Sequence, residues 1–238
     1  YVYADGKLYI HCAKSAGQKA KNLAADNRVC FTVIGQVEVM PEKFGAKYES
    51  VILFGTAKEL EGDDKQAVLE RIIRKFSADY LEAGVDGIQF GDDFGTTTSM
   101  LLSPERWREF FKPRYRQLMA PIKAAGKQIF FHTCGCSREI LPDLKEIGVD
   151  AIWPQQTAYD TQDLAALTKE LGLATAIHID RAGVMTSGTP EEVEREVHRT
   201  AKAFDIMNGG SWFYVETDNG FPFENIRALL RAISEYRK

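Results

Sequence analysis

A histidine and two cysteines alternate directly after an apolar, strand-like run in the segment FFHTCGCSREI, residues 130–140. Zinc binds Cys sulfur, His nitrogen and carboxylate oxygen, and its catalytic sites typically use three protein ligands. Because His132 and Cys134 are two residues apart, an extended strand end directs both side chains to one side. The spacing indicates a metal site. The alternatives are a pair of reactive thiols or a packed strand end with a free thiol.

Polar side chains also follow the other strand-like runs in the second half of the chain. They are Asp92 and Asp93 after GIQF, Gln155 and Gln156 after DAIW, His178 and Asp180 after ATAI, and Glu216, Asp218 and Asn219 after SWFYV. The carboxyl ends of parallel strands meet on one face of an α/β fold, where chemistry gathers. Cys136 and Glu216 are therefore both candidates for the third metal ligand, and the two aspartates are candidates for supporting the ligands through hydrogen bonds.

Three of these side chains, Asp92, Asp93 and His178, are the candidates for catalytic residues. Carboxylates and imidazoles carry protons in many active sites, and all three lie at predicted strand ends. An aspartate after a strand also commonly caps the following turn, and a histidine there can be a structural residue. Both interpretations stay open for each residue.

The elements that position these residues alternate between strand and helix after residue 84. The strand-like runs are GIQF, QIFFH, DAIWP, ATAIHI and SWFYVE, and each is followed by a segment of helical periodicity. This alternation is typical of βα units in a parallel sheet. Before it, apolar residues recur at three and four positions from Asp63 until Gly84, which predicts one amphipathic helix of roughly twenty residues.

The first 60 residues follow a different pattern. Short runs rich in β-branched and aromatic residues, KLYIHCA, RVCFTVIGQVEVM and ESVILFGTAKEL, are separated by Gly, Asn and Asp, which predicts antiparallel strands. Between the first two runs, KSAGQKAKNLAADN predicts a short helix. The change of pattern places one domain over residues 1–78 and a second over residues 79–238.

Composition and charge describe a globular protein. With 45% hydrophobic residues, a chain of 238 residues can bury a sizeable core. The net charge of −4 and the lack of a basic stripe argue against a nucleic-acid or membrane partner. The sequence has neither an apolar run long enough for a membrane span nor a signal-like start, so we expect a cytoplasmic protein whose four cysteines are reduced.

From about residue 80 to residue 238 the chain resembles the uroporphyrinogen decarboxylase superfamily, which includes zinc-dependent cobamide methyltransferases. The matching segments are LEAGVDGIQFGDDFGT, LLSPERWREFFKP, FFHTCGCSREILPDLKEIGVDAI, GTPEEVEREV and FPFENIRALL. The resemblance implies a (β/α)8-type barrel. It also implies that His132 and Cys134, which match the family's H-x-C-G segment, bind zinc, with a third ligand near Glu216 at the last strand.

The same resemblance implies methyl transfer as the activity. Zinc would act as a Lewis acid that lowers the pKa of a bound thiol or polarises a methyl-bearing heteroatom. The methyl group would pass to or from a corrinoid on a separate protein, so the expected partners are a small methyl donor or acceptor and a corrinoid protein. Decarboxylation is less favoured, because the substrate-binding Arg and Asp of that enzyme lie in a part of the family fold that this chain does not show.

The segment YADGKLYIHCAKSAGQKAKNL and the strands after it resemble the pyridoxamine-phosphate-oxidase-like split barrels, especially their nitroimidazole-resistance branch. The patterns are YIHCA-x3-G-x-K and YESV-x2-FG-x-A. The resemblance implies a dimeric, flavin-binding barrel with the FMN phosphate near His11, Ser15 and Lys19. A lysine beside free backbone N–H groups suits a phosphate. The alternative is a solvated helix face formed by Lys14, Lys19 and Lys21.

Together the two resemblances predict an α/β protein, with a partial (β/α)8-type barrel of about five βα units preceded by a partial antiparallel split barrel. A chimera of two partial domains explains both. Five parallel strands do not close a barrel, so an edge and an apolar face need cover, either from residues 1–60 or in a homo-oligomer. The leading hypothesis is an enzyme of zinc-dependent methyl transfer. The alternatives are an FMN-binding oxidoreductase and a chimeric scaffold without activity.

Overall fold

The computed structural model describes residues 1–12, 17–43 and 45–237, which form two compact units. The N-terminal unit spans residues 1–75 and the C-terminal unit residues 76–238. No helix in the described ranges combines the length and the apolar character that crossing a membrane requires.

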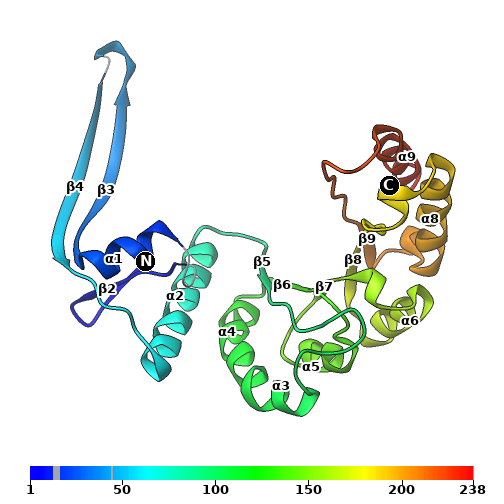
Figure 1. The fold of residues 1–238 in the computed structure, drawn as a ribbon, viewed down its shortest axis with the longest axis horizontal. Coiled ribbons are helices and arrows are strands. Elements are labelled where there is room, and N and C mark those ends of the chain that lie inside the picture. Colours follow the sequence, from blue (N-terminus) through cyan, green and yellow to red (C-terminus); the bar gives the residue numbers. More distant parts are fainter. Residues whose placement is uncertain (13–16, 44, 238) are drawn as a thin grey trace. The chain divides into compact units, whose positions relative to one another are not determined.

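The N-terminal unit contains antiparallel strands, as the alternating pattern predicts (Figure 1). Its elements are β1 (Val2–Ala4), β2 (Lys7–Tyr9), α1 (Gln18–Ala25), β3 (Arg28–Met40), the 3-10 turn η1 (Pro41–Lys43) and β4 (Gly45–Thr56). β1 pairs with β2, and β3 pairs with β4 in a long hairpin. Cross-strand neighbours such as Val33 and Val51 are β-branched, and such side chains pack well on a pleated surface. The antiparallel prediction is therefore confirmed, in the form of two hairpins.

The predicted amphipathic helix is α2 (Gly62–Glu82). Asp63 and Asp64 lie in its first turn, where negative charge interacts favourably with the helix dipole. Gly84 has a φ of +80°, a left-handed conformation that glycine adopts without strain after a helix end. The division between the two units, after Lys75, falls within this helix.

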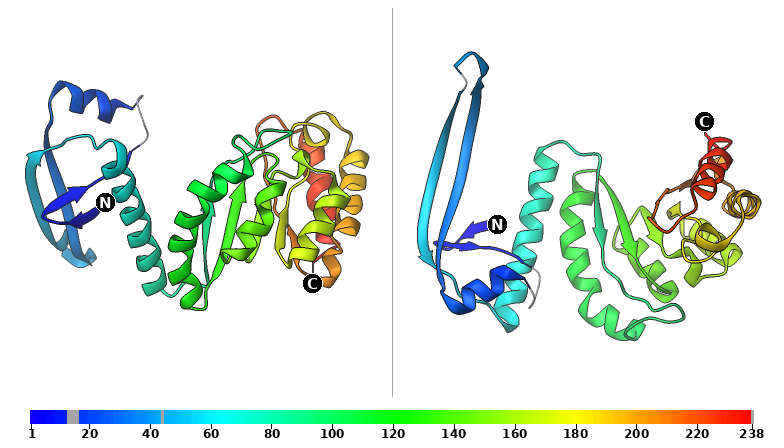
Figure 2. Two further views of the ribbon diagram at one scale, coloured as in Figure 1. Left: turned by 90° about the horizontal axis from the view of Figure 1, so that it is seen from below. Right: turned by 45° about the horizontal axis from the view of Figure 1, so that its top comes forward.

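The C-terminal unit is built on a parallel sheet whose five strands, in the described residues, lie side by side in chain order. The strands are β5 (Gly87–Gly91), β6 (Gln128–Thr133), β7 (Ala151–Pro154), β8 (Ala174–Ile177) and β9 (Ser211–Phe213). The helices are α3 (Pro104–Phe110), α4 (Lys112–Ala124), α5 (Leu141–Glu146), α6 (Thr161–Leu171), α7 (Val184–Ser187), α8 (Pro190–Ala203) and α9 (Phe223–Ser234). Three 3-10 turns are η2 (Arg138–Ile140), η3 (Gln156–Ala158) and η4 (Ile206–Asn208). Figure 2 shows strands and helices alternating along this unit, which confirms the predicted βα units.

Successive side chains of each strand face opposite sides of this sheet. Ile129 and Phe131 of β6 are fully buried in the hydrophobic core, which the sheet shares with residues of α3, α4, α5 and α6. Phe130 and His132 alternate with them and are only partly buried. The sheet face opposite the helices therefore carries His132.

The run PERWREFFKPRYRQLMAPIKAAG forms two helices, α3 and α4, rather than one. Pro113 has no N–H group with which to continue α3, and a new helix begins one residue before it, at Lys112. Ser103 caps α3 through its Oγ, which accepts a hydrogen bond from a backbone N–H. Thr189 and Glu192 form a reciprocal capping box at the start of α8.

An ion cluster around the buried Asp143 joins α3 and α4 to α5. The carboxylate of Asp143 has a side-chain exposure of 8% and accepts hydrogen bonds from Arg108 Nε at 2.9 Å and Lys112 Nζ at 2.6 Å. The hydrogen bond from Lys112 to Asp143 is the main cause of the raised pKa of that lysine. The Asp143 carboxylate thus compensates the positive charges of Arg108 and Lys112 where these side chains meet α5.

We expect Asp143→Ala to lower the free energy of unfolding by about 2 kcal/mol, because it removes the buried carboxylate that accepts charged hydrogen bonds from Arg108 and Lys112. Urea denaturation followed by circular dichroism measures this loss. Glu146→Ala is the matched control, since Glu146 also binds Lys112 at 2.6 Å but has a side-chain exposure of 57%. A much smaller loss is expected there, and equal losses for the two variants would refute the role given to burial.

Candidate metal centre

Three possible metal ligands meet at the carboxyl ends of β5 and β6. The ligand atoms of Asp93, His132 and Cys134 all lie within 4.8 Å of one another. His132 Nε2 lies 3.3 Å from Cys134 Sγ and 3.7 Å from Asp93 Oδ1. Tetrahedral zinc with its usual bond lengths places neighbouring ligand atoms roughly 3.3–3.8 Å apart. The oxygen, nitrogen and sulfur donors therefore fit zinc in kind, and the two distances from His132 Nε2 fit it in spacing.

The imidazole of His132 is oriented by a backbone carbonyl. Its Nδ1 lies 2.8 Å from the carbonyl oxygen of Trp153, and a carbonyl only accepts hydrogen bonds. Nδ1 is therefore the donor, and in the neutral ring Nε2 has the lone pair, which faces Cys134 and Asp93. Metal-ligating histidines are commonly oriented in this way.

The loop that carries Cys134 is held by several hydrogen bonds. The backbone N–H of Cys134 donates to Asp93 Oδ1 at 3.0 Å, and that of Gly135 donates to Gln155 Oε1 at 2.9 Å. The hydroxyl of Tyr159 accepts a hydrogen bond from the backbone N–H of Ser137 at 2.8 Å. These contacts hold the backbone at Cys134 and after it, and they therefore help to place its sulfur next to His132.

Burial and charge shift the pKa values of two groups at this centre. Burial raises the pKa of the Cys134 thiol, and the nearby carboxylate of Asp93 raises it further. Burial lowers the pKa of His178, which keeps its imidazole neutral at pH 7. A neutral imidazole is able to accept a proton.

A cavity of about 680 Å³ opens beside these residues. It is lined by His132, Cys134, Trp153, Gln155, Thr157, His178, Asp180, Arg181, Ala182, Thr186, Glu216, Asp218, Asn219, Gly220 and Phe221. The structure thus brings the predicted residues His178 and Glu216 to the same cavity as His132 and Cys134. Its size is within the range of small-molecule sites.

Glu216 lies in this cavity but outside the group of three possible ligands. Its Oε2 accepts a hydrogen bond from Arg181 Nη1 at 2.7 Å, and the same guanidinium binds Asp218. The arginine keeps Glu216 in a charge-assisted pair. Asp93, which the sequence placed among the catalytic candidates, lies in this group of three. The ligand role of Glu216 stays a prediction.

The other predicted residues lie away from the group. The Asp92 carboxylate accepts a hydrogen bond from the Tyr115 hydroxyl at 2.9 Å. Burial is the main cause of the raised pKa of that phenol, and the charge of Asp92 raises it further. Cys136 is a free thiol whose backbone N–H donates to the carbonyl of Thr96 at 2.7 Å. The catalytic role of Asp92 and the ligand role of Cys136 both stay predictions.

The predicted FMN residues lie in the N-terminal unit. His11 and Lys19 are exposed, and Ser15 lies outside the described residues. FMN binding therefore stays a prediction.

Sequence reasoning did not single out Trp153, Tyr159 or Arg181. Trp153 lies beside His132 in the register of the parallel pair β6–β7. This register is a property of the assembled sheet and cannot be read from the chain. The phenol of Tyr159 and the guanidinium of Arg181 act through contacts 22 and 35 residues away in the chain. Nothing in the local pattern marks either residue.

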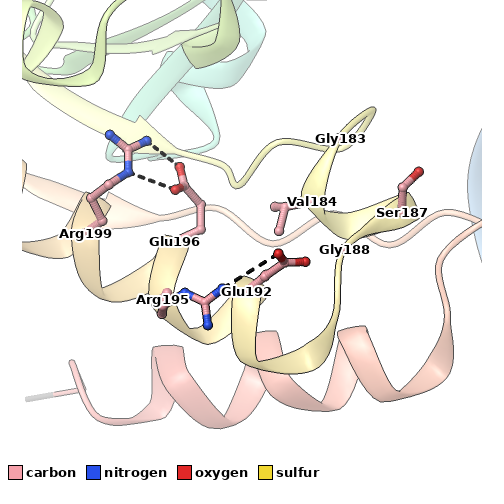
Figure 3. Close-up of a pocket in the computed structure, with 8 residues that line it drawn as sticks. All are labelled: Gly183, Val184, Ser187, Gly188, Glu192, Arg195, Glu196 and Arg199. Atoms are coloured by element: carbon pink, nitrogen blue, oxygen red, sulfur yellow. Dashed lines mark hydrogen bonds and ion pairs between the residues drawn. The ribbon is translucent and has the colours of Figure 1, made fainter.

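A second hollow, of about 720 Å³, lies along α7 and α8 (Figure 3). Its two arginines are already paired along the helix, since Arg199 binds Glu196 at 2.6 Å and Arg195 lies 3.7 Å from Glu192. Its lining contains neither a cysteine nor a histidine. The chemistry therefore favours the cavity at the strand ends.

Two solved structures share the fold of the C-terminal unit. A methyltransferase from Methanosarcina mazei aligns with 73% of this chain and 49% of its own, with a TM-score of 0.55 and 16% identity. Dihydropteroate synthase from Anaplasma phagocytophilum aligns with 74% of this chain and 70% of its own, with a TM-score of 0.52 and 17% identity. The unit is thus a portion of a TIM-type (β/α)8 barrel, as expected.

Sequence comparison then gives the family. The chain belongs to the uroporphyrinogen decarboxylase (URO-D) family, whose profile matches residues 66–236. It is 31% identical over 143 residues to the methylated-thiol–coenzyme M methyltransferase of Methanosarcina mazei, and 28% identical over 162 residues to the uroporphyrinogen decarboxylase of Chlorobaculum tepidum. These alignments cover 59% and 66% of this chain, but the chain spans only 36% and 43% of the two relatives.

The N-terminal region has a separate match. The profile of the pyridoxamine 5'-phosphate oxidase family covers residues 1–85. The chain therefore contains two regions that match different families, as its two sequence patterns predict.

Proposed function

We propose that the C-terminal unit carries a zinc-dependent methyl-transfer site, which moves a methyl group between a small thiol and a corrinoid on a partner protein. The observation that carries the proposal is the group of oxygen, nitrogen and sulfur donors from Asp93, His132 and Cys134. The 31% identity to a methylated-thiol–coenzyme M methyltransferase supports the reaction class.

His132 Nε2, Cys134 Sγ and Asp93 Oδ1 are the residues that would hold the metal, with Glu216 as the alternative to Asp93. When bound there, zinc supplies a Lewis acid that lowers the pKa of a thiol and favours the thiolate. Cys134 contributes negative charge only as the thiolate, so its raised pKa means that metal binding releases a proton.

The proton of the substrate thiol needs an acceptor in the same cavity. His178 lines the cavity and has a lowered pKa. Its Nδ1 lies 3.3 Å from the carbonyl oxygen of Ile179, so Nδ1 is the protonated nitrogen and Nε2 is free to accept. The sulfur of the substrate thiol then forms a bond to the methyl carbon. The bond between that carbon and the corrinoid cobalt breaks, and its electron pair stays on the cobalt.

The test is a methyl-transfer assay on the zinc-loaded protein. Free methylcobalamin serves as the donor, and a panel of small thiols, including coenzyme M, serves as the acceptor. We expect loss of the methylcobalamin absorbance at a rate that requires both zinc and a thiol. In His178→Gln this rate should fall roughly 100-fold or more, since 100-fold is the lower end of the usual range for a proton-transfer residue. Stoichiometric zinc without thiol-dependent demethylation would overturn methyl transfer while leaving the metal centre intact.

A further inference from the structure

The ring of His132 is packed against an aromatic stack on the same sheet face. Its centroid lies 4.2 Å from that of the Trp153 indole, and the indole lies 4.2 Å from the ring of Tyr214. Both pairs are tilted by 43°. The stack therefore runs from β6 through β7 to the residue that follows β9, with the indole in its middle.

Trp153 contacts His132 in two independent ways. Its carbonyl accepts the hydrogen bond from Nδ1 at 2.8 Å, which sets the tautomer. Its indole packs on the imidazole, which limits rotation of the ring about its side-chain torsions. The register of the parallel pair places His132 directly beside Trp153, so both contacts follow from one position in the sheet.

The indole is not held in place by a polar partner. Its Nε1 is buried and has no hydrogen-bond partner among the described residues. An unpaired buried N–H group costs roughly 1–3 kcal/mol, and phenylalanine would avoid that cost. The extent of the indole, which spans the distance between His132 and Tyr214, is the property that phenylalanine lacks.

We propose that Trp153, backed by Tyr214, is a positioning residue that holds the His132 imidazole with its Nε2 directed at Cys134 and Asp93. The inference rests on the proposed metal centre for its functional meaning. Its structural content, one tautomer in one orientation, belongs to the metal-free chain and can be measured there.

The first measurement is the tautomer of His132 by two-bond ¹H–¹⁵N NMR correlation in the metal-free protein. The chain has only four histidines, and His132→Gln assigns the signal. At a pH where the ring is neutral, we expect a single Nδ1–H tautomer in the wild type. In Trp153→Leu the backbone carbonyl remains, but without the indole the ring can rotate away from it, so we expect a mixture with the Nε2–H form. Trp153→Phe should restore much of the single tautomer, because it keeps an aromatic face against the imidazole.

The second measurement is zinc affinity by competition with a chromophoric chelator. Trp153→Leu and Tyr214→Leu should each raise the dissociation constant by about 10-fold, the lower end of the usual effect of groups that orient a ligand. Trp212→Leu is the matched control, since Trp212 packs on Phe130 outside this stack and is 40% exposed. It should leave both the tautomer and the affinity unchanged.

The outcomes separate the two proposals. A tautomer that shifts in Trp153→Leu, in a chain whose wild type binds no zinc, would retain the positioning role and reject the metal centre. A wild type that binds zinc, with tautomer and affinity unchanged in both leucine variants, would overturn the positioning role. Tyr214→Leu removes only the backing ring, so it provides the test if Trp153→Leu does not fold.

Discussion

Replacing His132 with alanine or Cys134 with serine should abolish stoichiometric zinc binding. Each change removes one of three donors, and we expect the dissociation constant to rise more than about 100-fold, beyond the usual 10–100-fold effect of groups that only orient a ligand. Elemental analysis after metal removal and zinc reloading gives the stoichiometry, and chelator competition gives the affinity. Cys136→Ser is the matched control, because Cys136 is a second free thiol two residues away, outside the group of three.

The third donor is decided by comparing Asp93→Asn with Glu216→Gln. Asp93 Oδ1 already lies 3.7 Å from His132 Nε2, whereas Glu216 is bound by Arg181 at 2.7 Å. We therefore expect Asp93→Asn to weaken zinc at least about 10-fold and Glu216→Gln to change the affinity little. The reverse order would make Glu216 the ligand and Asp93 a group that supports the loop. Zinc below half an equivalent in the wild type, unaffected by His132→Ala, would reject the centre altogether.

The elements of the fold were predictable because their signals are local. The three- and four-residue period after Asp63 gives α2 with its start displaced by one residue, to Gly62. Apolar runs bounded by turn residues give the five strands of the parallel sheet. The break between α3 and α4 depends on Pro113, and the helical period of apolar residues does not show it. How the N-terminal strands associate is a non-local property, and the alternating pattern says only that they pair.

The candidate site was predictable only in part, because some of its residues come together through contacts that are not local in the sequence. His132 and Cys134 are two positions apart on one strand end, so their shared direction follows from the period of a strand. Asp93 comes from a different strand, and the choice between it and Glu216 depends on a counter-ion. Arg181 binds Glu216 across 35 residues of chain, and no spacing rule shows that pairing. A carboxylate near the last strand is visible in the sequence, but its partner is not.

The backbone around Cys134 shows why the C-G-C segment needs its central glycine. Gly135 has a φ of +73°, and a Cβ atom there would lie 2.1 Å from the carbonyl carbon of Gly95. Gly95 in turn donates a hydrogen bond to the Cys134 carbonyl at 3.1 Å. The two glycines let the loops after β5 and β6 touch backbone to backbone, and this contact brings Asp93 and Cys134 together.

Gly135→Ala should therefore disable the metal centre as well as destabilise the fold. The left-handed conformation alone costs an ordinary residue roughly 1–2 kcal/mol, and the clash with Gly95 adds to it by forcing the loops apart. Gly126→Ala is the matched control, because Gly126 has a φ of +71° but nothing within 4 Å of the added Cβ. Urea denaturation and zinc titration of both variants separate the two effects. We expect similar backbone strain in both, but a rise of at least about 10-fold in the zinc dissociation constant only for Gly135→Ala, since the loss comes from moving Cys134 relative to Asp93. If both variants lose equal stability and both keep wild-type zinc affinity, the contact between Gly95 and Gly135 does not position the ligands.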